Sequence, residues 1–237
     1  MIERGFVAGA TGLTGRGVVR HLLARGAEAI AHVRPDAREL AAQRAAFEAL
    51  GARVDTTPWD EAAMTETLRR LAPSAVFALL GTTRKRAKAE GARDAAAAYE
   101  AIDYGLTALL RRAAEASGVR PRFVYVSMVG LDRSRDSKNP YTQVRVRIER
   151  ELVAGALPYT IVRPSLIIGD RDDARAGESL AAGALDGALG LVGALGGRRV
   201  RDRYRSITGD ALGAACVRLA FDADAQNRVF EPDALRA

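Results

Sequence analysis

The stretch Gly9-Ala10-Thr11-Gly12-Leu13-Thr14-Gly15 decides the fold, because it joins a short apolar run at residues 5–8 to a stretch of helical pattern at residues 14–25. Glycine at every third position permits a tight turn and leaves the first N–H groups of the next helix uncovered, and such a helix N-terminus binds phosphate. A lone glycine motif is weak evidence, since any strand-to-helix turn can use glycine. Its place before a series of further strand-helix units predicts a dinucleotide-binding turn. The residues expected to contact the dinucleotide here are Gly9, Thr11, Gly12, Leu13, Thr14 and Gly15.

Apolar runs of strand length alternate with amphipathic stretches of helix length up to residue 163. The expected strands are residues 5–8, 29–33, 52–55, 75–80, 122–127 and 159–162. The expected helices are residues 14–25, 37–50, 61–71, 93–117 and 141–154. This alternation is typical of an α/β protein with a doubly wound parallel sheet, the Rossmann fold.

The length of 237 residues suits a single domain. We expect residues 1–163 to form the cofactor-binding core and residues 164–237 to cover the substrate cleft and close the fold, with a helix at 209–221 and a last strand at 228–231. The Gly/Ala-rich stretch 177–197 is open to three interpretations, namely a lid, a dimer contact or a pair of small-residue helices. The oligomeric state is not predicted.

Composition limits the compartment and the partners. The single Cys216 allows no intramolecular disulfide, and neither it nor His21 and His32 has the spacing of metal ligands, so no metal site is expected. The N-terminus lacks the apolar core of a signal peptide, and no stretch is long and apolar enough to span a membrane. These features predict a cytoplasmic protein.

The net charge of +7 has two interpretations, a nucleic-acid surface or an evenly solvated one. The arginines are interleaved with acidic residues, which favours the solvated surface and predicts no nucleic-acid partner. The tightest basic cluster, residues 84–88, lies beside the expected cofactor edge and is either a phosphate contact or an exposed loop.

Arg34 follows the second expected strand, where a Rossmann fold meets the adenosine ribose. An acidic residue at this place bonds the 2′-hydroxyl of NAD, whereas arginine can hold the 2′-phosphate of NADP. The sequence therefore predicts NADP(H) in preference to NAD(H), with an ordinary exposed arginine as the alternative.

Further polar residues follow the later strands. Gly81, Thr82 and Thr83 come after the fourth strand, where backbone passes close to a cofactor and hydroxyls can bond ribose or phosphate. Ser127 ends the fifth strand. Tyr141 and Arg145 share one face of the next helix because they lie four residues apart.

Together these residues resemble the short-chain dehydrogenase/reductase superfamily, in its atypical NAD(P)-binding branch of NmrA-like and NAD-dependent epimerase/dehydratase-like proteins. Five further stretches look like the oxidoreductase group that includes the Tat-interacting protein. They are residues 80–84 (Leu-Gly-Thr-Thr-Arg), 89–91 (Ala-Glu-Gly), 139–145 (Asn-Pro-Tyr-Thr-Gln-Val-Arg), 161–171 (Ile-Val-Arg-Pro-Ser-Leu-Ile-Ile-Gly-Asp-Arg) and 175–178 (Arg-Ala-Gly-Glu).

The resemblance implies that Ser127 orients a substrate carbonyl, that Tyr141 exchanges the proton and that Pro164 lines the nicotinamide pocket. Arg145 occupies the place of the family's lysine, whose charge assists the tyrosine; arginine keeps the charge but not the shape. The expected function is an NADP(H)-dependent oxidoreductase that acts on a small carbonyl or alcohol by hydride transfer. The alternative is a non-catalytic NADP(H) sensor or scaffold with a protein partner.

Overall fold

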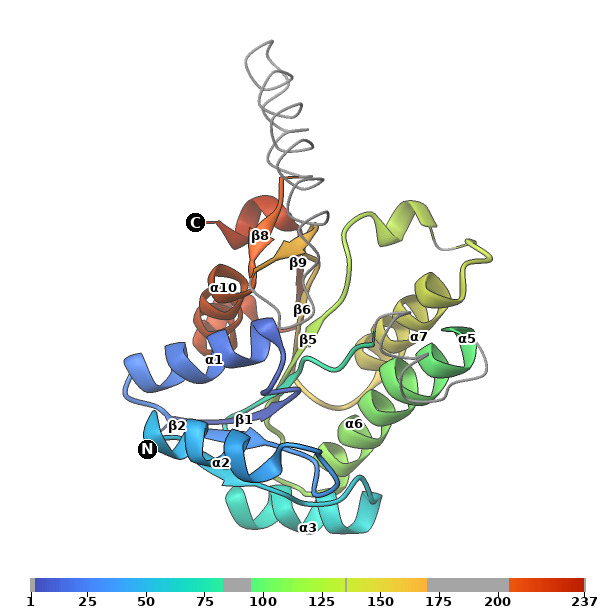
Figure 1. The fold of residues 1–237 in the computed structure, drawn as a ribbon. Helices are drawn as coiled ribbons and strands as arrows, with labels where there is room; N and C mark the ends of the chain where they lie inside the picture. Colours follow the sequence, from blue (N-terminus) through green and yellow to red (C-terminus); the bar gives the residue numbers. More distant parts are fainter. Residues whose placement is uncertain (1–2, 83–94, 135, 170–204, 237) are drawn as a thin grey trace.

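The computed structural model describes residues 3–82, 95–134, 136–169 and 205–236, which form one domain around a parallel sheet (Figure 1). In this part of the chain the sheet has seven strands in the order β3-β2-β1-β4-β5-β6-β9, and each neighbouring pair is parallel. The strands are β1 (Arg4–Ala8), β2 (Glu28–His32), β3 (Arg53–Asp55), β4 (Ala75–Ala78), β5 (Arg122–Val126), β6 (Tyr159–Val162) and β9 (Arg228–Phe230). The predicted Rossmann-like α/β fold is confirmed.

Helices connect these strands and cover both faces of the sheet (Figure 1). They are α1 (Leu13–Ala24), α2 (Leu40–Ala49), α3 (Glu61–Leu71), α5 (Ala95–Ala98), the π-helix η1 (Tyr99–Leu106), α6 (Thr107–Ala116), α7 (Pro140–Ala154) and α10 (Gly209–Phe221). Short 3-10 turns lie at η2 (Leu131–Ser134), η3 (Ala223–Ala225) and η4 (Pro232–Leu235). The predicted helix 93–117 is therefore three consecutive helical pieces in its described part.

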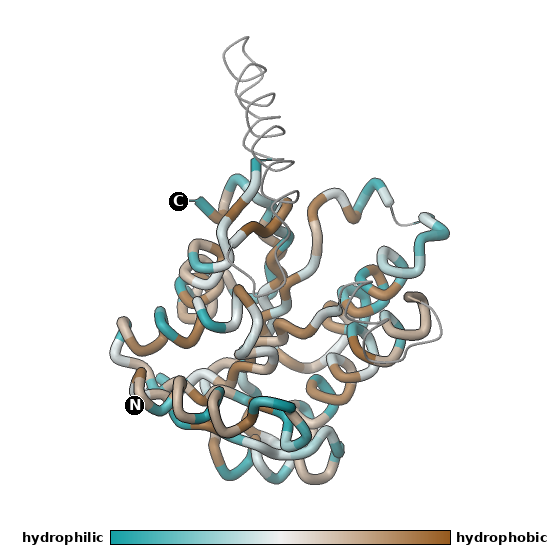
Figure 2. The backbone as a smooth tube through the Cα atoms, viewed as in Figure 1, coloured by the Kyte–Doolittle hydropathy of each residue, from teal (hydrophilic) through white to brown (hydrophobic). Residues whose placement is uncertain are grey.

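Alternate strand residues enter two separate cores, because successive side chains of a strand point to opposite faces. Val7 and Phe77 pack with residues of α1 and α10 on one face. Phe6 and Val76 pack with residues of α3, α6 and α7 on the other. Hydrophobic colour accordingly gathers on the strands and on the helix surfaces that face them (Figure 2).

The close contact of α1 with α10 depends on glycine. A Cβ built on Gly213 would lie 2.6 Å from the carbonyl carbon of Gly17, so any larger residue would push the two helices apart. Helix α10, which was predicted at the same bounds, therefore packs beside α1 on the same face of the sheet.

Two short strands were not predicted. β7 (Ile167–Ile168) and β8 (Ile207–Thr208) pair in parallel as a second small sheet. Two residues are too few to show an alternating pattern, and their partners are far apart in the sequence. The basic cluster 84–88 and the stretch 177–197 lie outside the described residues.

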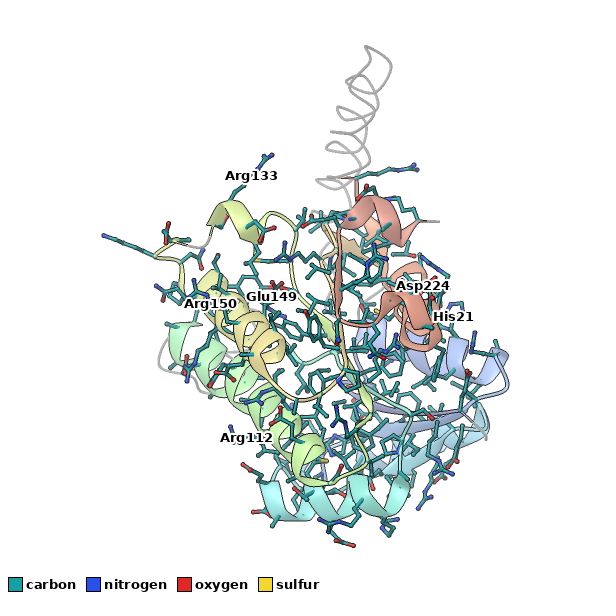
Figure 3. The ribbon with its side chains drawn as sticks, turned by 180° about the vertical axis from the view of Figure 1, so that it is seen from behind. His21, Arg112, Arg133, Glu149, Arg150 and Asp224 are labelled. Atoms are coloured by element: carbon teal, nitrogen blue, oxygen red, sulfur yellow. The ribbon has the colours of Figure 1, made fainter. Side chains whose placement is uncertain are left out.

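Arginines are spread over the described surface, and several of them form ion pairs with carboxylates. Arg112 and Arg133 lie near opposite ends of the molecule (Figure 3). Arg112 Nε is 2.8 Å from Glu61 Oε2, and Arg147 Nη1 is 2.9 Å from Glu100 Oε1. Among the described helices, none combines the length and the apolar character that a membrane crossing requires.

Candidate cofactor-binding and active site

A cleft of about 620 Å³ opens at the carboxyl ends of the parallel strands. The strand order reverses between β1 and β4, and ligands of doubly wound sheets bind at such a switch point. Every predicted site residue in the described part of the chain lines this cleft. Thr83, also predicted, is outside the described residues. These lining residues are Gly9, Thr11, Gly12, Leu13, Thr14, Gly15, Arg34, Gly81, Thr82, Ser127, Tyr141, Arg145 and Pro164.

The glycine turn brings backbone, not side chains, to the floor of the cleft. Gly9 has φ +85°, and a Cβ on it would lie 2.6 Å from the Leu79 carbonyl oxygen. A Cβ on Gly15 would lie 2.1 Å from the Gly9 carbonyl oxygen. Gly12 precedes α1 without a side-chain cap, so the first N–H groups of the helix are left for another acceptor. This cradle fits a diphosphate.

The adenosine end of the cleft has two exposed arginines. Arg34 follows β2, as predicted, and its Nε lies 3.6 Å from Asp36 Oδ1. Arg38 lines the same end of the cleft. It was not predicted from the sequence, although it is a second positive charge only four residues after Arg34. Gln43 was also missed: its Oε1 is buried and has no hydrogen-bond partner among the described residues. Two cations and a polar amide at this end suit a phosphorylated ribose.

His32 forms part of the wall of this end beside Trp59. Its Nε2 lies 2.8 Å from the Thr57 carbonyl oxygen, so Nε2 carries the hydrogen and donates it. Its ring centroid is 5.6 Å from that of Phe6 and 4.8 Å from that of Trp59. Burial lowers the pKa of His32, against smaller raising effects of Thr57 and Asp55. The imidazole is therefore neutral at physiological pH.

Ser127 and Tyr141 line the other end of the cleft. Ser127 follows β5, and its Oγ is buried without a hydrogen-bond partner in the described part of the chain. Tyr141 lies in the first turn of α7, where its N–H donates to Asn139 Oδ1 at 2.9 Å. The Tyr99 ring packs edge-on against Tyr141, with 5.2 Å between centroids.

Arg145 lies one turn further along α7 and is almost fully buried. Its Cζ is 4.8 Å from the centroid of the Tyr141 ring. Nη1 donates to Tyr125 Oη at 3.0 Å and to the Val126 carbonyl oxygen at 2.7 Å, and Nη2 donates to Asp103 Oδ1 at 2.8 Å. Nε is buried and has no partner among the described residues.

The pKa values show which charges this end holds. Burial lowers the pKa of Arg145, but Tyr125, Tyr141 and Asp103 raise it by more, so the guanidinium stays charged. Burial raises the pKa of Asp103, and Arg145 and the Thr82 N–H counteract part of that rise. Burial also raises the pKa of Tyr125, so its hydroxyl stays protonated.

Asp103 is the most important residue that sequence reasoning missed. It lies within η1, between two residues that line the cleft, Ile102 and Leu106. A π-helix inside an α-helical run is often found at a functional site, but its hydrogen-bond pattern has no sequence signature. The available signal was a second carboxylate, three residues after Glu100, in a mostly apolar stretch of the predicted helix.

Comparison with known proteins identifies the class. Residues 9–195 match the family model described as NAD(P)H-binding, and the chain therefore belongs to this family.

Among curated proteins, the chain is similar to fungal proteins named FMP52. It is 30% identical to the mitochondrial protein fmp52 of Aspergillus niger over 192 residues, which cover 78% of this chain and 74% of that one. It is 29% identical to FMP52 of Saccharomyces cerevisiae over 95% of this chain and 90% of that protein. With three other FMP52 proteins the match spans only 42%, 44% and 51% of their length.

Solved structures with the same fold contain different cofactors. AtPrR2 with NADP+ and (+)pinoresinol superposes with a TM-score of 0.67 at 15% identity, over 97% of this chain and 69% of that one. UDP-glucose 4-epimerase from Brucella ovis in complex with NAD gives 0.62 at 18% identity, over 92% and 72%. The fold alone thus does not choose between NAD and NADP.

The predicted cytoplasmic location is wrong. All six matching curated relatives are named as mitochondrial proteins. The prediction depended on the lack of an apolar secretion signal, but mitochondrial targeting segments are amphipathic and arginine-rich, and an apolar signal is not required for them. A chain with one cysteine is compatible with either compartment.

Proposed function

We propose that this protein is an NADP(H)-dependent oxidoreductase of the short-chain dehydrogenase type, which interconverts a small carbonyl compound and its alcohol. The observation that supports this most directly is that Ser127, Tyr141 and Arg145 line the same cleft as the glycine turn. The same proposal includes membership of the Tat-interacting-protein group. It also includes a cofactor-binding core at residues 1–163 and a substrate-covering part at residues 164–237.

The residues present fit the cofactor at both ends of the cleft. The cradle that a Cβ on Gly9 or Gly15 would fill accepts the diphosphate, and the N-terminus of α1 binds its charge. Arg34 and Arg38 hold the 2′-phosphate, which favours NADP(H) over NAD(H). Pro164 lines the nicotinamide side, and the Thr82 hydroxyl bonds ribose or phosphate. Bound NADP(H) supplies or accepts the hydride.

The chain itself moves the proton. Ser127 Oγ, which lacks a partner among the described residues, donates a hydrogen bond to the substrate carbonyl oxygen. The Tyr141 hydroxyl donates its proton to this oxygen during reduction and accepts it from the alcohol during oxidation. Arg145 holds the Tyr141 ring from the next turn of α7.

The test is NADPH consumption by the purified protein with a panel of aldehydes and ketones. We expect turnover of at least one member, and its loss in Ser127→Ala with NADPH binding retained. NADPH binding without turnover of any member would contradict the catalytic part of the proposal.

A second candidate is a non-catalytic NADP(H) sensor that binds a protein partner. It is favoured by one observation: both terminal nitrogens of Arg145 bond to groups within the protein, and its charge is paired with Asp103. For this candidate, capture of one defined partner should depend on added NADPH. Capture that is equal with and without NADPH would exclude it.

A further inference from the structure

Asp103 joins two walls of the cleft through one carboxylate. Oδ1 accepts from Arg145 Nη2 at 2.8 Å, and Oδ2 accepts from the Thr82 N–H at 3.0 Å. Arg145 belongs to α7, whereas Thr82 lies on the segment that leaves β4. The Asp103 side chain is completely buried, and its contact with Arg145 is buried as well, whereas its contact with the Thr82 N–H is partly buried.

The segment after β4 leaves the hydrogen-bond ladder of the sheet shortly before Thr82. β4 ends at Ala78, and the last ladder-like bond is from the Leu79 N–H to the Ala8 carbonyl oxygen at 3.0 Å. Gly81 then passes close to the ion pair: a Cβ there would lie 3.3 Å from Arg145 Nη2 and 3.4 Å from Asp103 Oδ1. Leu80, Gly81 and Thr82 all line the cleft, so the position of this segment shapes the cofactor site.

A carboxylate is the side chain that these contacts require. Both partners, the guanidinium and the amide N–H, are donors, and an ionised carboxylate offers two acceptor oxygens. An amide of the same size would offer one oxygen and turn its NH₂ toward the other donor. A buried arginine also needs a compensating negative charge.

We infer that Asp103 is a positioning residue for the cofactor, which fixes residues 81–82 against Arg145 and balances the arginine charge. This inference rests on the proposed function, since the site that it shapes is the NADP(H) site. In this arrangement Arg145 does not offer its charge to the cofactor or substrate. Its two terminal nitrogens instead connect α7 to β5 and to Asp103.

The test compares two double variants that both lack the ion pair. In Asp103→Asn/Arg145→Met the asparagine oxygen can still accept from the Thr82 N–H, whereas Asp103→Leu/Arg145→Met removes the acceptor at residue 103. Removing both charges avoids a buried unpaired one, so we expect similar unfolding temperatures for the two variants. We expect the asparagine variant to bind NADPH about tenfold more tightly than the leucine variant, because it keeps the hydrogen bond to the Thr82 N–H.

Glu149→Gln serves as the matched control. Glu149, labelled in Figure 3, lies on α7. Its Oε2 is 2.6 Å from Arg163 Nη2 in another buried ion pair, and Glu149 is not among the described residues that line the cleft. This change should lower the unfolding temperature and leave the NADPH affinity within about twofold of the wild type, because the Glu149 carboxylate bonds to Arg163 and holds neither Arg145 nor Thr82.

The outcomes separate the two claims. Equal NADPH affinity of the two folded double variants would overturn the positioning role while the proposed function stands. A wild-type protein that binds no NADPH would overturn the proposed function and the inference with it.

If the double variants do not fold, hydrogen exchange of the Thr82 amide in the wild-type protein tests the positioning role of Asp103. We expect this amide to exchange as slowly as those of β4, because it is bonded to a buried carboxylate. Exchange as fast as in exposed loops would overturn the inference.

Discussion

The two ends of the cleft differ in the atoms that line them: backbone at one end and side chains at the other. At the diphosphate end, Gly9, Gly12 and Gly15 present backbone within one turn of seven residues, and a Cβ at the first or last of them would meet backbone atoms. At the end lined by Ser127 and Tyr141, the residues Arg145, Asp103 and Tyr125 come from three elements and meet through side chains. The first end is defined by local sequence, and the second only by the packing of distant segments.

This difference predicts which property of the protein each end loses when one of its residues is substituted. A backbone cradle loses affinity when volume is added, because backbone atoms cannot move aside. A side-chain cluster loses stability or turnover when one member is removed, because its partners are left buried and unpaired. The four changes below test this contrast, from the largest expected effect to the smallest.

Tyr141→Phe should lower turnover by about 10²–10⁴-fold, the range for loss of a general acid or base, while NADPH affinity changes little. Steady-state kinetics and a binding titration measure the two quantities. Tyr104→Phe is the control, since the Tyr104 hydroxyl donates to Glu151 at 2.8 Å and is not among the described groups that line the cleft. Equal turnover of Tyr141→Phe and the wild type would remove Tyr141 from the mechanism.

Arg145→Met should destabilise the fold by about 3–5 kcal/mol, because it leaves Asp103 buried and unpaired. The loss should depend on pH. Burial already raises the pKa of Asp103 above its ordinary value of 3.8, and without Arg145 the pKa rises further. A group whose folded pKa exceeds its unfolded pKa stabilises the fold when protonated, and this stability is lost as the pH rises.

The deficit of Arg145→Met against the wild type should therefore shrink as the pH falls from about 8 toward 5. Thermal unfolding of both proteins across this range measures it. A deficit that grows on acidification would show that Asp103 is not the group left unpaired.

Gly15→Ala should weaken binding of both NADPH and NADH by about 10- to 100-fold, which corresponds to an overpacking cost of about 1–3 kcal/mol. The added Cβ would lie 2.1 Å from the Gly9 carbonyl oxygen. Gly12→Ala gives a graded control, because its Cβ would lie 3.3 Å from the same oxygen and the loss should be smaller. Equal losses would mean that crowding at Gly9 does not control the cradle.

Arg34→Ala should weaken NADPH binding by about tenfold and leave NADH binding almost unchanged, since one exposed charge-assisted contact to the 2′-phosphate is removed. The ratio of the two dissociation constants is the measurement. Arg44→Ala is the control, because Arg44 pairs with Glu48 on α2 and does not line the described cleft. An unchanged ratio in Arg34→Ala would separate Arg34 from cofactor choice.

The same contrast explains what the sequence could predict. Strand and helix periodicity placed the sheet, and the helices α3 and α10 begin and end where predicted, because their apolar faces are regular. Arg34 was found because it directly follows the second strand, and Tyr141 because it shares a helix face with Arg145 in a stretch that resembles a known family. Asp103 was not found, since its importance comes from a π-helix and from partners 21 and 42 residues away.

The most direct test of the central claim is a titration of the purified protein with NADPH and NADH, followed by cofactor fluorescence and thermal shift. We expect NADPH to bind with a dissociation constant on the order of micromolar and about tenfold more tightly than NADH, as two arginines at the adenosine end require. Binding of neither cofactor would contradict the account, because the glycine turn would then be only a structural feature of the sheet.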